Sequence, residues 1–116
     1  MSQRTCIVSV PHTPPSYAPV DFVKGARVVI TKRDTEWPAF LWCINADGEG
    51  AWIPENYLDR NDEVGILNVE YSSVELTADK GEQLTIVKSE GGWHWCRNSH
   101  GKLGWIPERN VNVEKN

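Results

Sequence analysis

Trp52-Ile53-Pro54-Glu55 occurs twice in this chain of 116 residues, because it returns 53 residues later as Trp105-Ile106-Pro107-Glu108. The surroundings return with it: Trp42-Cys43 lies ten residues before the first copy, and Trp95-Cys96 lies ten before the second. Such a repeat predicts two copies of one small domain. We place these copies at residues 1–60 and 61–116. Two copies are too few to form a stacked repeat array, so each should hold its own core.

Alternation of apolar residues predicts short strands throughout both copies. Residues 27–31 and 83–87 face their apolar positions inward at every second residue. Two hairpins should follow, with Asp47-Gly48 and His100-Gly101 in their turns. No stretch has a helical period, so we predict an all-β chain of two five-stranded barrels. The short charged segment 59–65 is expected to link them.

Composition excludes several classes of partner. The chain carries 12 Lys and Arg against 16 Asp and Glu, for a net charge of −4, and it has no basic stripe. We therefore expect no nucleic-acid partner. No basic amphipathic or long apolar segment suggests a membrane partner, and no secretory leader is recognisable, so we expect a cytoplasmic protein.

The three cysteines, Cys6, Cys43 and Cys96, do not form a disulfide framework. Cys43 and Cys96 occupy the same position in the two copies, which favours small buried apolar residues. His94 lies between two tryptophans, but no histidine has the spacing of a metal site. No phosphate loop or nucleophile motif is present, so we expect no cofactor, no metal and no enzymatic activity.

Three stretches of the second copy resemble a Src-homology-3 (SH3) domain. They are residues 75–82, residues 92–96 and residues 104–108, which are similar to the family patterns acidic-Leu-x-Phe-x-x-Gly-Glu, Trp-x-x-Ala and Gly-aromatic-Ile-Pro. The first copy matches best at residues 51–58. The chain thus resembles a divergent double SH3 protein of the bacterial type, with barrels whose aromatic grooves bind proline-rich peptides.

The resemblance implies a set of peptide-binding residues in each copy. In the second copy, Val69 replaces the first groove tyrosine and Asn110 replaces the last. In the first copy, Val8 and Val10 stand at the two early tyrosines. We expect the second copy to be the better groove. The matched residues are Tyr71, Trp93, Trp105 and Pro107 in the second copy, and Phe40, Trp52, Pro54 and Tyr57 in the first.

Strand alternation also predicts an outward aromatic patch on each copy. Trp42 joins Phe40 and Trp52 in the first copy, and Trp95 joins Trp93 and Trp105 in the second. Such patches mark either a binding surface or a face that packs against the other copy or a second chain.

We therefore interpret the chain as a protein-interaction module that binds a proline-rich or extended peptide of a protein partner. The alternative is a structural role, in which the two barrels pack as a rigid pair or form a homodimer. A third and weaker alternative is a module that binds the peptidoglycan of the cell wall.

Overall fold

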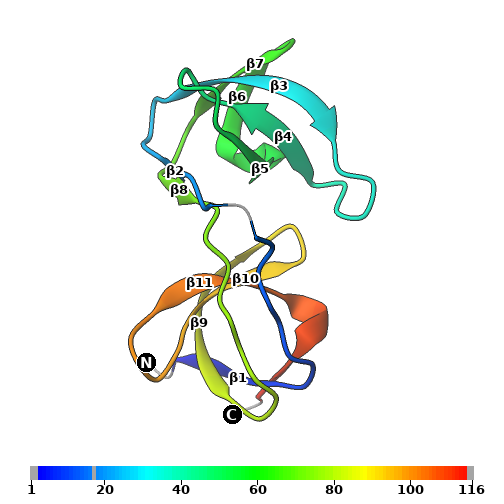
Figure 1. The fold of residues 1–116 in the computed structure, drawn as a ribbon, viewed down its shortest axis with the longest axis vertical. Helices are drawn as coiled ribbons and strands as arrows, with labels where there is room; N and C mark the ends of the chain where they lie inside the picture. The colour runs from blue at the N-terminus through cyan, green and yellow to red at the C-terminus, as the bar shows by residue number, and fades with distance from the viewer. Residues whose placement is uncertain (1–2, 17, 115–116) are drawn as a thin grey trace. The chain divides into compact units, whose positions relative to one another are not determined.

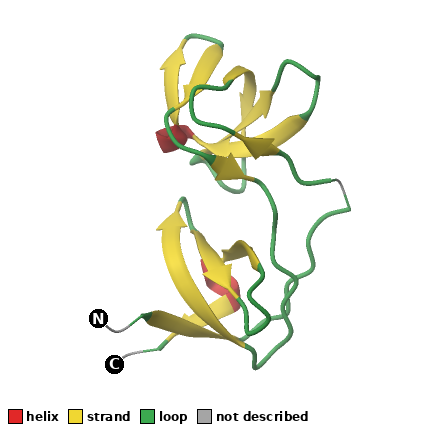
Figure 2. Ribbon diagram, turned by 90° about the vertical axis from the view of Figure 1, so that its left-hand side faces the viewer, coloured by secondary structure: helices red, strands yellow, loops and turns green. Residues whose placement is uncertain are grey.

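The computed structural model describes residues 3–16 and 18–114, which contain β-strands and two single turns of 3-10 helix (Figure 2). The chain forms two compact units (Figure 1). One combines Met1–Tyr17 with Val74–Asn116, and we call it the split unit. The other is the single stretch Ala18–Ser73, which we call the continuous unit. The predicted all-β class is confirmed, since each unit holds a five-stranded antiparallel sheet.

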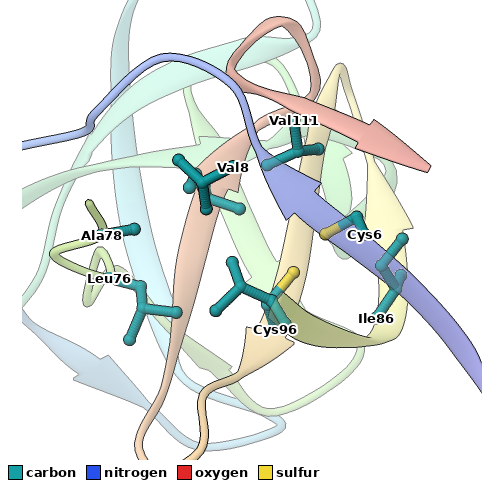
Figure 3. Close-up of a cluster of buried hydrophobic side chains, with 9 residues drawn as sticks. Cys6, Val8, Leu76, Ala78, Ile86, Cys96 and Val111 are labelled. Atoms are coloured by element: carbon teal, nitrogen blue, oxygen red, sulfur yellow. The ribbon is translucent and has the colours of Figure 1, made fainter. Parts of the chain in front are cut away.

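The split unit builds its sheet in the order β11-β10-β9-β1-β12. Strands from the centre and from both edges of the sheet contribute to one buried cluster (Figure 3). The sheet is therefore curved around its core, as in a small barrel. The strands are β1 (Arg4–Val8), β9 (Gln83–Glu90), β10 (Trp93–Arg97), β11 (Leu103–Pro107) and β12 (Val111–Val113), with a 3-10 turn at Glu108–Asn110.

The continuous unit repeats this plan in the order β5-β4-β3-β7-β6, and a small second sheet pairs β2 with β8. Val28 and Ile30 of β3 are buried while Val29 is exposed, as the alternation predicted. The hairpin turn after β4 uses Gly48 at φ 83°, a backbone conformation that glycine adopts without strain. The elements are β2 (Asp21–Phe22), β3 (Arg27–Arg33), β4 (Phe40–Ile44), β5 (Gly50–Pro54), a 3-10 turn (Glu55–Tyr57), β6 (Leu58–Asn61), β7 (Val64–Leu67) and β8 (Tyr71–Ser72).

Strands β1 and β7 occupy equivalent places in the two sheets. In the split unit β1 lies between β9 and β12, with Cys6 opposite Leu84. In the continuous unit β7 lies between β3 and β6, with Gly65 opposite Val28. Each sheet thus takes its first strand from the other sequence copy. The two copies have exchanged these strands within one chain.

This exchange corrects two expectations from the sequence. The structure does not divide the chain into residues 1–60 and 61–116, because β1 belongs with the second copy and β7 with the first. Residues 59–65 are also no linker, since β6 and β7 form a hairpin in which Asn61 pairs with Val64. Only Asp62 and Glu63 lie in its turn, with Asp62 at φ 54°. A repeat in the sequence aligns the copies but does not say which first strand each sheet accepts.

The core around each first strand fits one strand better than the other. A Cβ atom at Gly65 would lie 3.2 Å from Leu58 and 3.3 Å from Ile30, which is tighter than ordinary contact. The split unit has Cys6 at this place, and the smaller Val111 stands where the continuous unit has Leu58. The continuous unit therefore favours the glycine of β7, and the split unit has room for the cysteine of β1.

All three cysteines are free and buried, which confirms the prediction made for Cys43 and Cys96. Burial raises the pKa of Cys43 to about 12. In the split unit the thiols of Cys6 and Cys96 interact, which lowers the pKa of Cys6 and raises the pKa of Cys96. These groups act as core side chains, and the pair connects β1 to β10.

The side chain of His94 is buried in the core, on the opposite face of β10 from its sequence neighbours Trp93 and Trp95. It is only 4% exposed and stands opposite Ser89, whose hydroxyl makes a 2.5 Å hydrogen bond with its Nδ1. The equivalent residue of the continuous unit is the buried Leu41. Burial lowers the pKa of His94, with Glu108 opposing this effect and Arg4 adding to it.

We predict that residues 18–73 expressed alone fold cooperatively, because they contain every strand of the continuous unit. Residues 1–60 should be clearly less stable, since β1 would have to place Cys6 against Ile30 and Leu58. Chemical denaturation followed by tryptophan fluorescence compares the two fragments. Equal denaturation midpoints for the two fragments would show that the sheet of the continuous unit accepts either β1 or β7.

We predict that Gly65→Cys in the full chain lowers the unfolding free energy of the continuous unit by about 1 kcal/mol or more, because overpacking a core is destabilising. Denaturant unfolding monitored by amide signals of each unit measures this loss. Val29→Cys on the exposed face of β3 is the control and should change little. A stabilised Gly65→Cys protein would contradict the argument from core size.

We predict that the split unit loses stability as pH falls below about 6.5, the ordinary value for histidine. The folded state lowers the pKa of His94, so the unfolded state binds the proton more tightly and acid favours unfolding. The loss is at most about 1.4 kcal/mol per pH unit and ends at the folded pKa. His94→Leu, which copies Leu41, should flatten this slope in melting experiments between about pH 5 and 8, the range over which histidine titrates. An unchanged slope would assign the pH dependence to other groups.

Candidate functional site

The aromatic site of the continuous unit is built on the β4–β5 hairpin. Phe40 pairs with Pro54 across the two strands, and Trp42 pairs with Trp52. Successive residues of a strand point to opposite faces, so these four side chains share one face of the hairpin, where Phe40 and Pro54 are buried and Trp42 and Trp52 are half-buried. The alternate residues, Leu41, Cys43, Ala51 and Ile53, are buried in the core.

Tyr71 completes this site and does not lie with Trp93, contrary to our expectation from the sequence. Its hydroxyl donates a 2.8 Å hydrogen bond to the carbonyl oxygen of Trp52. Its ring meets Tyr57 edge to face, with 5.7 Å between centroids, and stacks on Phe22 at 6.3 Å. Tyr71 lies in the continuous unit, and not with Trp93, because β7 and β8 belong to the continuous unit. We define the aromatic site as Phe40, Trp52, Pro54, Tyr57 and Tyr71.

Trp42 and Trp52 form a cross-strand aromatic pair on the β4–β5 hairpin. Trp42 and Trp52 meet at 5.1 Å between centroids, and Lys32 lies over the Trp52 ring at 5.8 Å. A Cβ atom at Gly50 would overlap the Trp42 ring, so this glycine makes room for the indole. Cross-strand aromatic pairs stabilise sheets, which gives this pair a structural role.

The split unit repeats the pair with Trp95 and Trp105, 5.2 Å apart, and with Lys88 over Trp105 at 5.9 Å. The outward patches are less exposed than the sequence suggested. Phe40 and Trp105 are buried, whereas Trp42, Trp52, Trp93 and Trp95 are half-buried.

A charged cluster lies next to Pro54 in the continuous unit. Glu55 accepts two hydrogen bonds from Arg33, at 3.0 and 3.1 Å, and one from Arg60 at 3.1 Å. Arg33 lowers the pKa of Glu55, with a smaller effect from Arg60. Arg33 also donates to the carbonyl oxygen of Pro38 at 2.6 Å. The cluster ties the loop after β3 to the 3-10 turn that carries Tyr57.

The equivalent face of the split unit has a different composition. The register places His12 opposite Ala78, just as Tyr71 stands opposite Phe22. His12, and not Val10, therefore occupies the place of the second early tyrosine, and Val8, expected at the first, is a core residue. The face comprises His12, Trp93, Trp105, Pro107 and Asn110, with Trp93 paired to Pro107 as Phe40 is to Pro54.

Two of these replacements are held by the split unit's own chain. Asn110 donates from its amide nitrogen to the carbonyl oxygens of Val10 and Pro11, at 3.1 and 3.2 Å. His12 meets Trp93 edge to face at 5.8 Å, and its Nε2 lies 2.8 Å from Glu75. These groups fix the segment after β1 and leave Trp93 and Trp105 as the large aromatic residues of this face, where the other unit has Phe40, Trp52, Tyr57 and Tyr71.

Sequence reasoning missed His12 as a member of the split unit's face and Phe22 as the buried ring on which Tyr71 stacks. The signal was present, because His12 and Tyr71 each lie four residues after the end of a first strand, at Val8 and Leu67. Counting from the strand ends would have aligned them, but the shared motifs fixed the copies only at the later strands.

The described residues offer no other kind of site. Within 3–16 and 18–114, no three His, Cys, Asp or Glu side chains gather in a way that could hold a metal. In the same part of the chain, no helix has the length and apolar character needed to cross a membrane.

Residues 67–114 match the family model of the variant SH3 domain. The match covers the last strands of the split unit together with Tyr71, and the two five-stranded sheets are consistent with two SH3-like units. No curated protein and no solved structure matches the chain significantly. An SH3 domain is typically a non-catalytic binding module with a general capacity for peptides. The match to residues 67–114 supports this general role and no specific ligand.

Proposed function

We propose that the chain binds an extended, proline-containing segment of a protein partner, and that the aromatic site of the continuous unit holds it. The observation that carries this proposal is that Tyr71 brings Tyr57 and Trp52 together on one side of the continuous unit. The Tyr71 ring contacts the Tyr57 ring at 5.7 Å between centroids, and the Tyr71 hydroxyl donates a 2.8 Å hydrogen bond to the carbonyl oxygen of Trp52.

Flat rings suit this ligand for a physical reason. A polyproline II helix has no internal hydrogen bonds and is preformed, so little conformational entropy is lost when aromatic walls enclose its prolines. Tyrosine and tryptophan supply large contact areas at low entropic cost and often dominate binding interfaces.

Comparison between the units supports the choice of the continuous unit over the split unit. Our expectation from the sequence favoured Trp93 because it counted Tyr71 on the same face. With Tyr71 beside Trp52, the continuous unit has Phe40, Tyr57 and Tyr71 where the split unit has Trp93, Asn110 and His12. The split unit also uses Asn110 to hold its own backbone.

We predict that Tyr57→Asn, which copies Asn110, weakens binding of a decaproline probe at least tenfold, because removal of a central aromatic residue costs about 1.4 kcal/mol or more. Tyr57 is half-buried and lies in a turn, so the core of the unit should remain intact. Amide shift titration with the full chain measures both the affinity and the site.

Trp93→Ala, on the split unit, is the matched control and should change the affinity less than about twofold, which corresponds to roughly 0.4 kcal/mol. Shifts centred on Trp93 and Pro107 would move the site to the split unit. Absence of shifts at high peptide concentration, with proline-rich library peptides as well, would contradict peptide binding by either face.

A further inference from the structure

Strand β1 fills a slot that the split unit cannot leave empty. It pairs with β9 along one edge and with β12 along the other. Cys6 is 0% exposed and Val8 is 1% exposed, so both belong fully to the core (Figure 3). Without β1, two strands would lose their hydrogen-bond partners and the cluster around Cys96 would open.

The slot and its strand are far apart along the chain. After β1 the chain enters the whole continuous unit, and it returns to the split unit only at Val74. Two anchoring points flank the departing segment. His12 and Ala78 exchange backbone hydrogen bonds of 2.9 and 3.0 Å, and Val20 and Ser73 hold each other by bonds of 2.8 and 3.0 Å.

The stretch between these anchors is rich in proline. Pro14, Pro15 and Pro19 lie between His12 and Val20. Proline donates no backbone hydrogen bond and restricts its neighbours to extended conformations. The stretch can therefore direct β1, together with His12, to the split unit of another chain, where His12 would bond that chain's Ala78.

We propose that a second copy of this chain is a partner, and that the two chains exchange β1 so that each β1 fills the slot between β9 and β12 of the other. Every backbone pair and core contact of β1 is retained in this arrangement. The two forms then differ only in the connecting stretch and in the entropy of association, which is why such exchange is a low-cost route to dimers.

The core directs β1 to the other chain's split unit and not to its continuous unit. The slot of the continuous unit is filled by β7, which is fastened to β6 by a two-residue turn. It is also too tight for Cys6, since a Cβ atom at Gly65 would already lie 3.2 Å from Leu58. The exchange is therefore reciprocal between equivalent slots.

Concentration and the length of the connection decide between the two forms. A short flexible tether gives an effective concentration on the order of millimolar, so the closed monomer should dominate in dilute solution. The return connection from Ser73 to Ala78 joins the same two anchors with four residues, whereas deleting residues 13–18 leaves Pro19 alone between His12 and Val20. So short a connection should disfavour the closed monomer and leave the exchanged dimer accessible.

The two cysteines of the slot report where β1 lies. Cys6 on β1 and Cys96 on β10 are neighbours in the split unit, and their thiols interact. Diamide accepts two electrons and two protons, one of each from each thiol, as the sulfur–sulfur bond forms. In an exchanged dimer the two sulfurs come from different chains. Cys43→Ala removes the third thiol, which lies in the continuous unit.

The test compares the deletion variant with the full-length chain, both carrying Cys43→Ala. We expect the deletion variant to elute as a dimer at concentrations where the full-length chain is monomeric, and diamide to convert it to a covalent dimer on a non-reducing gel. Adding Cys96→Ala should abolish the covalent dimer. Full-length chain refolded at about millimolar concentration, near the effective concentration of the tether, should give the same product.

Two results would overturn the proposal. One is a chain that stays monomeric in both the deletion variant and the concentrated refolding. The other is a dimer whose disulfides are all within single chains, or which dissociates at once on dilution, because an exchanged β1 must leave a folded core before the chains separate.

Discussion

The two-residue turn between β6 and β7 is the constraint on which the rest of the structure depends. Asp62 and Glu63 can span only about 10 Å, so the strands on either side must be neighbours. Closing so short a loop also costs little conformational entropy compared with pairing distant strands. Once β7 lies against β6 and β3, the sheet of the continuous unit is complete, and β1 is left for the split unit.

This exchange determines the chemistry of the two faces as well as the topology. The segment after each first strand crosses the aromatic face, so the strand brings a face residue with it. β7 brings Tyr71 to Trp52 and Tyr57, whereas β1 brings His12 to Trp93 and Glu75. The continuous unit becomes the aromatic face, and the split unit becomes a face of mixed polarity held by its own hydrogen bonds.

Local features of the fold could be predicted from the sequence, because strand periodicity and turn residues act over a few positions. The inward facing of Val28 and Ile30, the hairpin turn at Gly48 and the burial of Cys43 and Cys96 follow from such local rules. The partner of each first strand could not be predicted in this way. Both candidates, β1 and β7, have alternating patterns that suit either sheet, and the choice depends on contacts between residues far apart in sequence.

The same limit explains why the candidate site was only partly predicted. Phe40, Trp52, Pro54 and Tyr57 lie on one hairpin and its following turn, so their grouping needed only local reasoning. Tyr71 was assigned to the wrong face because its position depends on which sheet accepts β7. The length of segment 59–65 suggested a linker, although a charged segment of this size also suits a hairpin that ends in a two-residue turn.

Core size and loop length both select the pairing of β7 with β3 and of β1 with β9. The free-energy cost of a misfitting core side chain is larger than the cost of lengthening the loop. Placing Cys6 at the position of Gly65 would overpack the continuous unit at a cost of about 1–3 kcal/mol, and Gly65 in the split unit would leave a void of methyl size worth about 1 kcal/mol more. Lengthening a loop costs only about 0.6 kcal/mol for each doubling. A longer turn would therefore remove the geometric requirement and still leave the cores to select their strands. The two-residue turn thus permits only the exchanged fold, and the volumes at Gly65, Leu58, Cys6 and Val111 would still favour that fold if the turn were longer.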